Sequence, residues 1–317
     1  MRLINLVPIG TKIEFLRFRK LAGILSLILC VASVALFMTK GLNYGIDFRG
    51  GILIEVRTPE PADLSKLRSQ LGDLGLGEVQ LQEFGEPTDV LIRIERQPGG
   101  EKAQQVAVTK AKKALGDKVN YRRTEFVGPK VGGELIEAGI TAVLAALAAM
   151  LIYIWFRFEW QFGLGAVVAL LHDVILTIGI FSLLGLEFNL STVAAILTIA
   201  GYSINDTVVV YDRVRENLRK FKQMSLDELL NLSINGTLSR TLLTSVTTLI
   251  ALLTLYFFGG EVIKGFSFAM IWGVIVGTYS SIFIAVPLLV YMNLRRTGLI
   301  VGENDHDEAA EKIVEQG

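Results

Sequence analysis

Six long apolar runs restrict this chain to a membrane-embedded fold. A helix of about 20 apolar residues crosses the roughly 30 Å hydrocarbon layer, and each run is of that order. The chain of 317 residues is 51% hydrophobic and its mean hydropathy is +0.50, which excludes a large soluble enzyme. The predicted spans are Leu21–Thr39, Ala138–Phe156, Phe162–Gly185, Phe188–Tyr211, Thr241–Phe258 and Gly265–Leu294.

Basic residues beside the runs predict their orientation. The first 20 residues hold five Lys and Arg, Arg157 separates the second and third runs, and the 212–240 loop is basic. The short turns on the opposite side hold only Lys264. By the positive-inside rule, both termini lie in the cytoplasm. The first run has basic flanks and no small-residue cleavage site, so we expect an uncleaved anchor.

Residues 41–133 are predicted to form a small α+β domain outside the membrane. Their pattern gives the order βαββαβ, which is typical of a ferredoxin-like sandwich of one sheet and two helices. The segment holds no histidine, cysteine or glycine-rich phosphate loop, whereas an exposed sheet edge suits an extended polypeptide. The predicted elements are strands Ile52–Arg57, Val79–Phe84, Val90–Glu95 and Val119–Val127, and helices Pro61–Leu71 and Glu101–Leu115.

The predicted fold class is a polytopic α-helical membrane protein with six transmembrane helices, one plus five, and a small α+β ferredoxin-like extracytoplasmic domain. Asp212–Lys222 extends the fourth span as a basic amphipathic helix. Ser225 and Glu228 form a capping box, which should start a short helix on the membrane surface. The expected divisions are 1–40 (cytoplasmic N-terminus and helix 1), 41–133 (extracytoplasmic domain), 134–301 (helices 2–6, with cytoplasmic loop 212–240) and 302–317 (disordered cytoplasmic tail).

Composition argues against several kinds of site. The one cysteine, Cys30, lies inside an apolar run, so it offers no internal disulfide, metal or redox site. Acidic and basic residues are equal in number, which gives no argument for nucleic-acid binding. We therefore expect no cofactor, no metal, no nucleic-acid partner and no enzymatic activity.

Asp206 is the first candidate functional residue. It lies about 10 Å from the centre of a span bracketed by Glu187 and Asp212, and a carboxylate at that depth marks a functional site by default. Arg240 enters the membrane from the same side, and an opposite charge there would make the proton affinity of Asp206 sensitive to small movements. Two alternatives stay open: Arg240 extends to the headgroups, or Asp206 forms a static bridge between helices.

His172 and Asp173 interrupt the third span near its middle. A histidine titrates near neutral pH, so a proton relay is one interpretation. The other is local hydrogen bonding between helices. Adjacent residues point about 100° apart on a helix, so the two side chains need not serve one site.

Small and polar residues surround these candidates. Gly201 and Ser203 flank the Asp206 turn, and Asn205 is predicted to hydrogen-bond within the bundle. Gly273 and Gly277 form a small-xxx-small face, which indicates close helix packing.

The connection after the first span, residues 41–51, mixes glycines with Asp47 and Arg49. Glycines indicate a tight entry into the first strand. We expect the two charged side chains to be solvated at the membrane interface.

These motifs resemble the SecF members of the SecD/SecF protein-export family, which is itself similar to the resistance-nodulation-division transporters. The resemblance covers nearly the whole chain, and its most specific part is the stretch from Ser203 to Asp206. The matching stretches are Gly45-Ile-Asp-Phe-Arg-Gly-Gly51, Phe126-Val-Gly-Pro129, His172-Asp173, Gly201-Tyr-Ser-Ile-Asn-Asp206, Arg213-Val-Arg-Glu216, Ser239-Arg-Thr-Leu-Leu-Thr-Ser245 and Gly259-Gly260.

The resemblance implies a function. It implies a subunit of the bacterial cytoplasmic (inner) membrane that pairs with a SecD-like subunit beside the SecYEG channel. A YajC-like small subunit is a further partner that the resemblance allows. Such subunits use the proton-motive force in a late step that draws unfolded preproteins outward. Asp206 takes the place of the family's protonatable aspartate and Arg240 that of its intramembrane arginine, while His172 and Asp173 match a family pattern.

Three other functions fit parts of the sequence. A half-transporter of the same superfamily would export a small molecule or lipid by proton antiport, but it needs a deep apolar pocket in the outer domain. An intramembrane aspartyl protease would use Asp173 and Asp206, but it needs both at one depth. A passive scaffold would use its intramembrane charges only to bridge helices.

Overall fold

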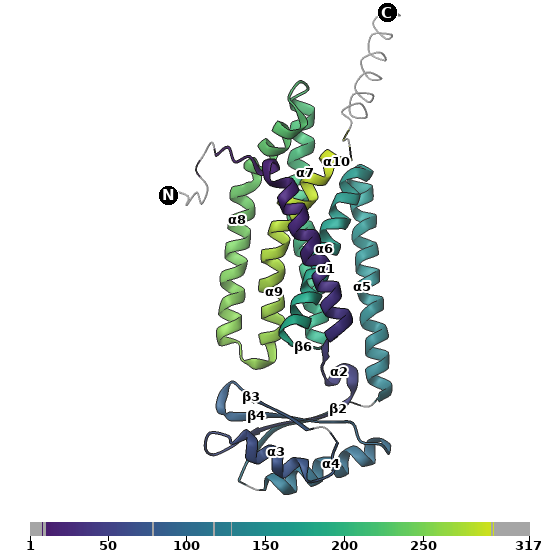
Figure 1. Cartoon of the computed structure of the whole chain (residues 1–317), viewed down its shortest axis with the longest axis vertical. Coiled ribbons are helices and arrows are strands. Elements are labelled where there is room, and N and C mark those ends of the chain that lie inside the picture. Colours follow the sequence, from purple (N-terminus) through teal and green to yellow (C-terminus); the bar gives the residue numbers. More distant parts are fainter. Residues whose placement is uncertain are drawn as a thin grey trace, which may run out of the picture.

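The computed structural model describes residues 8, 11–77, 79–116, 118–127, 129–292 and 294, which form a helix bundle with a sheet beyond one end (Figure 1). Six of its helical segments are long and apolar enough to cross a membrane, so the predicted number of spans is confirmed and the chain is a multi-pass membrane protein. The tail 302–317, predicted to be disordered, lies outside the described residues. The spans are Phe15–Lys40, Gly133–Arg157, Trp160–Leu184, Leu190–Lys220, Leu226–Phe258 and Ile263–Tyr291.

The bundle is organised around the sixth span. Its helix α9 packs against α6, α7 and α8, while α1 packs along α6 and α5 contacts α6 and α7. The 3₁₀ turn η1 precedes α1, and the π-helical segment η2 separates α9 from α10. The bounds are η1 Phe15–Phe18, α1 Arg19–Lys40, α5 Pro129–Arg157, α6 Trp160–Leu184, α7 Leu190–Lys220, α8 Leu226–Phe258, α9 Glu261–Ser280, η2 Ser281–Ala285 and α10 Val286–Tyr291.

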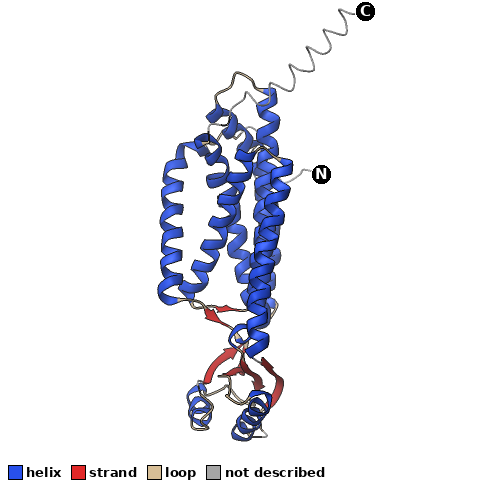
Figure 2. Ribbon diagram, turned by 90° about the vertical axis from the view of Figure 1, so that its right-hand side faces the viewer, coloured by secondary structure: helices blue, strands red, loops and turns tan. Residues whose placement is uncertain are grey.

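Between α1 and α5 the chain forms a four-stranded antiparallel sheet of order β3-β4-β2-β5. Helices α3 and α4 cover the face turned away from the bundle (Figures 1 and 2). The order βαββαβ and this strand order confirm the ferredoxin-like α+β prediction. We call β2 to β5 with α3 and α4 the sheet unit. Its bounds are β2 Gly51–Arg57, α3 Leu64–Gly72, β3 Val79–Phe84, β4 Glu86–Ile94, α4 Gly100–Leu115 and β5 Asn120–Val127.

Alternation along the strands separates the two faces of the sheet. Ile52, Ile54 and Val56 of β2 are fully buried against the helices. Residues between them, such as Glu55 and Arg57, point to the face turned toward the bundle. The sheet unit therefore has its own apolar core, and its face toward the bundle combines charged side chains with the buried Leu53 and Leu91.

A small two-stranded parallel sheet lies between the sheet unit and the bundle. β1 (Asn43–Tyr44) follows the first span and pairs with β6 (Glu187–Phe188), which joins α6 to α7. The single-turn helix α2 (Ile46–Arg49) then leads into β2. The entry to the sheet unit is thus fixed to the start of α7.

The region before the fifth span differs from the sequence prediction. The capping box is present: Ser225 accepts from the Glu228 amide, and the Glu228 side chain accepts from the Ser225 amide. The helix it starts is α8 itself, which continues to Phe258 and is not a separate surface helix. The reason is packing against the end of α7, where Asn217 donates to Ser233 at 2.8 Å and Leu229 is fully buried.

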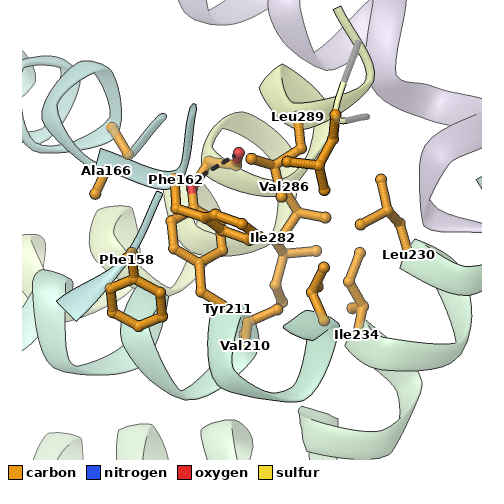
Figure 3. Close-up of a cluster of buried hydrophobic side chains, with 14 of the residues drawn as sticks. Phe158, Phe162, Ala166, Val210, Tyr211, Leu230, Ile234, Ile282, Val286 and Leu289 are labelled. Atoms are coloured by element: carbon orange, nitrogen blue, oxygen red, sulfur yellow. Dashed lines mark hydrogen bonds between the residues drawn. The ribbon is translucent and has the colours of Figure 1, made fainter. Parts of the chain in front are cut away.

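The sixth span changes from α to π geometry at Ser281. Pro287 lies just beyond and has no backbone N–H to give to a carbonyl in the preceding turn. Tyr211, fully buried among Phe158 and Phe162, donates its hydroxyl to the Ala285 carbonyl at 3.0 Å (Figure 3). A side chain from α7 is therefore hydrogen-bonded to the backbone at the last residue of the π-helical segment.

Glycines bring α9 close to α7. A Cβ at Gly273 would lie 2.2 Å from Ile199, and one at Gly277 would lie 3.1 Å from Ser203. The small-xxx-small face predicted for the sixth span is therefore the contact between α7 and α9.

Candidate functional site

Asp206 lies at the junction of three helical elements. Its side chain, on α7, is only 8% exposed. Thr241 of α8 donates to Oδ1 at 2.7 Å, and Ser281 at the start of η2 donates to Oδ2 at 2.6 Å. Both carboxylate oxygens are thus hydrogen-bonded by neutral hydroxyl groups, which can also exchange protons with them.

Asp173 forms a second buried centre on α6. It is fully buried and accepts from Ser203 of α7 at 2.5 Å and from Ser280 of α9 at 2.8 Å, both on Oδ2. His172 Nδ1 lies 2.9 Å from its Oδ1. Adjacent residues on a helix need not serve one site, but here the side chains of His172 and Asp173 turn toward each other.

The two carboxylates are linked through adjacent residues of the sixth span. Ser280 donates to Asp173, and Ser281 donates to Asp206, where the span turns from α to π geometry. We call Asp173, Asp206 and these two serines the carboxylate network. A change in the backbone at this position would alter the hydrogen bonds of both carboxylates together.

His172 extends this network toward the first span. Its Nε2 is buried and has no hydrogen-bond partner among the described residues. Its ring lies 6.0 Å from that of Tyr279, whose hydroxyl is 2.9 Å from Ser26 on α1. One imidazole nitrogen therefore contacts Asp173, and the other is buried without a hydrogen-bond partner among the described residues.

Two predicted site residues lie outside the buried network. Arg240 is exposed on the surface of α8 and lies within electrostatic reach of Asp206, but the oxygens of Asp206 are bonded to Thr241 and Ser281 instead. Asn205 is also exposed, so the predicted hydrogen bond within the bundle is absent from the described residues. Neighbouring positions point to different faces of α7, which explains why Asp206 is buried and Asn205 is not.

The small residues beside Asp206 have different environments. Ser203 is buried and donates to Asp173, whereas Gly201 is exposed and has only the end of Met150 within 4.0 Å of a Cβ position. Ser203 is therefore a hydrogen-bond donor to the carboxylate network as well as a packing residue.

Asp47, expected to be solvated, is half-buried and has a partner within the protein. Its Oδ2 accepts from the Leu190 amide at 3.0 Å, at the first turn of α7. Arg49 is exposed and lines a pocket of about 430 Å³ between the sheet unit and α2. No local pattern predicts that residue 47 meets residue 190, since this contact depends on how β1 pairs with β6.

Sequence reasoning also missed the donors. Ser280, Ser281 and Thr241 resemble ordinary small residues of a packed helix, and only the positions of the helices show that their hydroxyl groups converge on carboxylates. The signal available was the adjacent pair of serines in a long apolar run. Among the described residues, no group of three His, Cys, Asp or Glu side chains could hold a metal ion.

Comparison with known proteins agrees with this architecture. Residues 107–295 match the family described as Protein export membrane protein SecD/SecF, C-terminal, and residues 35–58 match the SecD/SecF GG motif. The chain is 50% identical over 288 residues to the protein translocase subunit SecF of Rickettsia bellii, covering 90% of this chain and 95% of that protein. It is 46% identical over 308 residues to SecF of Rhodobacter capsulatus, covering 92% of each.

Solved structures give the same assignment. The crystal structure of SecDF from Thermus thermophilus, described as a translocon-associated membrane protein, superposes with a TM-score of 0.82 at 36% identity and covers 92% of this chain. A SecDF structure in a super-membrane-facing form gives a TM-score of 0.68 at 36% identity. This chain spans 40% of the first of those chains and 41% of the second. From sequence and fold together, the chain belongs to the SecF family of SecD/SecF protein-export membrane proteins.

Proposed function

We propose that this protein is an accessory subunit of the Sec protein translocase that, paired with a SecD-like subunit, uses the proton-motive force to promote late steps of preprotein export. The observation that carries this proposal is the carboxylate network, in which two buried carboxylates inside the membrane bundle are held by hydroxyl groups from several helices. Isolated charges at such depth are costly, so two of them indicate a function that uses protons.

Asp206 is the proton-binding group of this proposal. When ionised, it is stabilised by the two hydroxyl donors; when protonated, it can donate to one of those oxygens. Either change rearranges hydrogen bonds to α8 and η2. Proton binding at Asp206 is thereby converted into a change in contact between helices.

Asp173 and His172 supply a second step of the same path. Ser280 and Ser281 are neighbours in the chain, so the two carboxylates share one short segment of backbone. A proton leaving one carboxylate can reach the other through hydroxyl groups if the segment at η2 moves. In this proposal His172 exchanges protons with Asp173 through Nδ1.

Arg240 and Asn205 support a partner within the membrane. Both are polar and exposed on spans where an isolated chain would meet lipid. Polar side chains at membrane depth are usually covered by another helix. A SecD-like subunit would cover them and bring Arg240 into the proton path. The SecYEG channel, a YajC-like subunit and the unfolded preprotein are further partners of this proposal.

The location follows from the charges. The α7–α8 connection and the start of α1 lie at the end of the bundle opposite the sheet unit (Figure 1). Arg157, Arg215 and Arg219 lie at that same end, which the positive-inside rule places in the cytoplasm. The sheet unit would then lie outside the bacterial cytoplasmic membrane, where emerging preproteins pass.

The contacts favour this function over two alternatives. An aspartyl protease needs carboxylates that share one proton, whereas Asp173 and Asp206 are each bonded to their own serine. A small-molecule exporter needs an apolar pocket, whereas the 430 Å³ pocket on the sheet unit is lined by Arg49, Arg93 and Arg96.

Export from membrane vesicles tests the proposal. Vesicles with and without this chain are given a preprotein already engaged in the channel, and a proton gradient is the only energy source. We expect the chain to accelerate completion of export, and an uncoupler to abolish the acceleration. Equal export rates in the two kinds of vesicle would contradict the proposal.

A further inference from the structure

A set of contacts joins the sheet unit to the start of α7, and the carboxylate network does not account for it. We call this set the outer joint: β1, α2, β6 and the first turn of α7. β1 pairs in parallel with β6, and the Gly45 amide donates to the Phe188 carbonyl at 2.9 Å. The connection into the sheet unit is thus hydrogen-bonded to the loop that begins α7.

Asp47 makes the most specific contact of the outer joint. The N-cap of α7 is Asn189, which accepts from the Thr192 amide, and this leaves the Leu190 amide without an intrahelical partner. Asp47 accepts from that amide at 3.0 Å. A carboxylate also interacts favourably with the positive end of a helix dipole. Asp47 therefore caps a helix to which it is not joined in sequence.

Glycines make this approach possible. A Cβ at Gly45 would lie 2.6 Å from a carboxylate oxygen of Glu187. Gly51 has φ of +128°, and a Cβ there would lie 2.8 Å from the Ile94 carbonyl. Gly51 therefore cannot be replaced without strain, and a side chain at Gly45 would displace the Glu187 carboxylate, so the glycines on either side of Asp47 serve the close contact of this connection with β6 and β4.

An ion pair gives the outer joint a second link. Arg93, in the middle strand β4 of the sheet unit, pairs with Glu187 of β6. The two side chains are 17% and 26% exposed, so the pair is largely shielded from water. Arg93 lies on the sheet face turned to the bundle, and Glu187 is three residues before the first residue of α7.

Helix α7 connects the outer joint with the carboxylate network. It runs without a break from Leu190 to Lys220, and Asp206 lies 16 residues after its start, or about 24 Å along the axis. A continuous helix moves as a rigid element over that length. A displacement at Leu190 would therefore reach the Asp206 side chain with little loss.

We propose that Asp47 is a positioning residue which, together with the Arg93–Glu187 ion pair, fixes the sheet unit to α7 so that rearrangement of the carboxylate network moves the sheet unit. The link between the sheet unit and α7 follows from the contacts of the outer joint alone. Its role in proton-driven movement rests on the proposed function.

The test compares two aspartates that each cap a helix. Asp47→Ala removes the cap of α7, whereas Asp63→Ala removes the cap of α3 inside the sheet unit, where Asp63 accepts from Ser65 and Lys66. We expect Asp47→Ala to lower proton-dependent export by roughly fivefold, the change that a typical cap represents. Asp47→Asn keeps an acceptor oxygen and should restore most of the rate, and Asp63→Ala should leave the rate unchanged.

The ion pair is tested by exchanging its charges. Arg93→Glu and Glu187→Arg should each lower proton-dependent export, and the two together should recover it. Recovery of export in the double variant would show that the two residues contact each other, because two variants that each only destabilised the protein would not restore export when combined. Equal losses in the single and double variants would contradict the second link.

A distance measurement separates this inference from the proposed function. Spin labels at Thr109 on α4 and Leu253 on α8, both exposed, are introduced into the full chain with its partner after Cys30→Ala. We expect Asp47→Ala to broaden the distance distribution and Asp63→Ala to leave it narrow. An unchanged distance distribution in Asp47→Ala would contradict the proposal that Asp47 fixes the sheet unit to α7, whatever the export result. A broadened distribution without gradient-dependent export in the unaltered protein would contradict only the proposed function.

Discussion

Ser281 donates a 2.6 Å hydrogen bond to Asp206 at the position where the sixth span turns from α-helix to π-helix. The preceding serine donates to Asp173. Short π-helical segments are rare in proteins, and those that occur often lie at functional sites. The hydrogen bonds of two carboxylates and the geometry of one helix therefore meet at two adjacent residues.

Replacing Ser281 tests this coupling. Ser281→Ala leaves one oxygen of Asp206 without its donor, a loss of about 1–3 kcal/mol in a buried site. We expect proton-dependent export to fall severalfold and its pH profile to change. The measurement is export rate against pH in energised vesicles.

Ser267→Ala is the matched control for that variant. Ser267 is also buried on α9, but it donates only to the Ile263 carbonyl of its own helix. Its rate and pH profile should match those of the unaltered protein. A similar profile change in both variants would show that the effect is one of packing.

The contact between α7 and α9 is tested at Gly273. Gly273→Ala places a methyl group against Ile199, and overpacking of this kind costs about 1–3 kcal/mol. We expect a lower unfolding temperature in detergent, partly recovered by adding Ile199→Ala. Gly265 lies on the same helix with nothing within 4 Å of a Cβ, so Gly265→Ala should leave the temperature unchanged or raise it slightly. Equal destabilisation by both alanines would argue against the close contact.

Acid should weaken the sheet unit through Asp89. Arg57 bonds both carboxylate oxygens at 2.5 Å, and this hydrogen bonding holds the pKa of Asp89 below its ordinary value. A carboxyl whose pKa is lower in the folded state stabilises the fold above its unfolded pKa. That stability is lost as pH falls through the folded pKa.

Hydrogen exchange of β2 and β4 measures this effect in the full chain. The unaltered protein should be better protected than Asp89→Asn at neutral pH, and the difference should shrink below the usual Asp range. Comparing the two proteins at each pH cancels the intrinsic dependence of exchange on pH. A difference that persists in strong acid would mean that Asp89 does not act through its charge.

Most of the fold could be predicted because its patterns are local. Apolar runs located all six spans, and alternation located Val79–Phe84 to the residue. Strand β4 begins at Glu86, four residues before the predicted Val90, because backbone pairing in the hairpin continues where the side chains are polar. The continuity of α8 depended on packing against α7, which no local pattern contains.

The site could be predicted only in part. A lone carboxylate in an apolar run made Asp206 a candidate, since an ionisable group at membrane depth is costly unless its neighbours compensate it. The partners of Asp206 required the relative rotation of α7, α8 and η2, which placed Thr241 and Ser281 against it and left Arg240 at the surface. The contact of Asp47 with α7 required the pairing of β1 with β6 for the same reason.

Asp206→Asn distinguishes a proton carrier from a carboxylate that only holds helices together. The amide keeps the shape of the side chain and can still hydrogen-bond to both hydroxyl groups, accepting from one and donating to the other, but it cannot bind and release a proton at neutral pH. Asp212→Asn, on the same helix but paired with Arg157 at the surface, is the control. Preprotein export is measured in vesicles energised only by a proton gradient, with copurification of the SecD-like subunit confirming assembly. We expect Asp206→Asn to assemble and to lose all gradient-dependent export, while Asp212→Asn retains it; normal export by assembled Asp206→Asn would show that Asp206 is not the proton carrier.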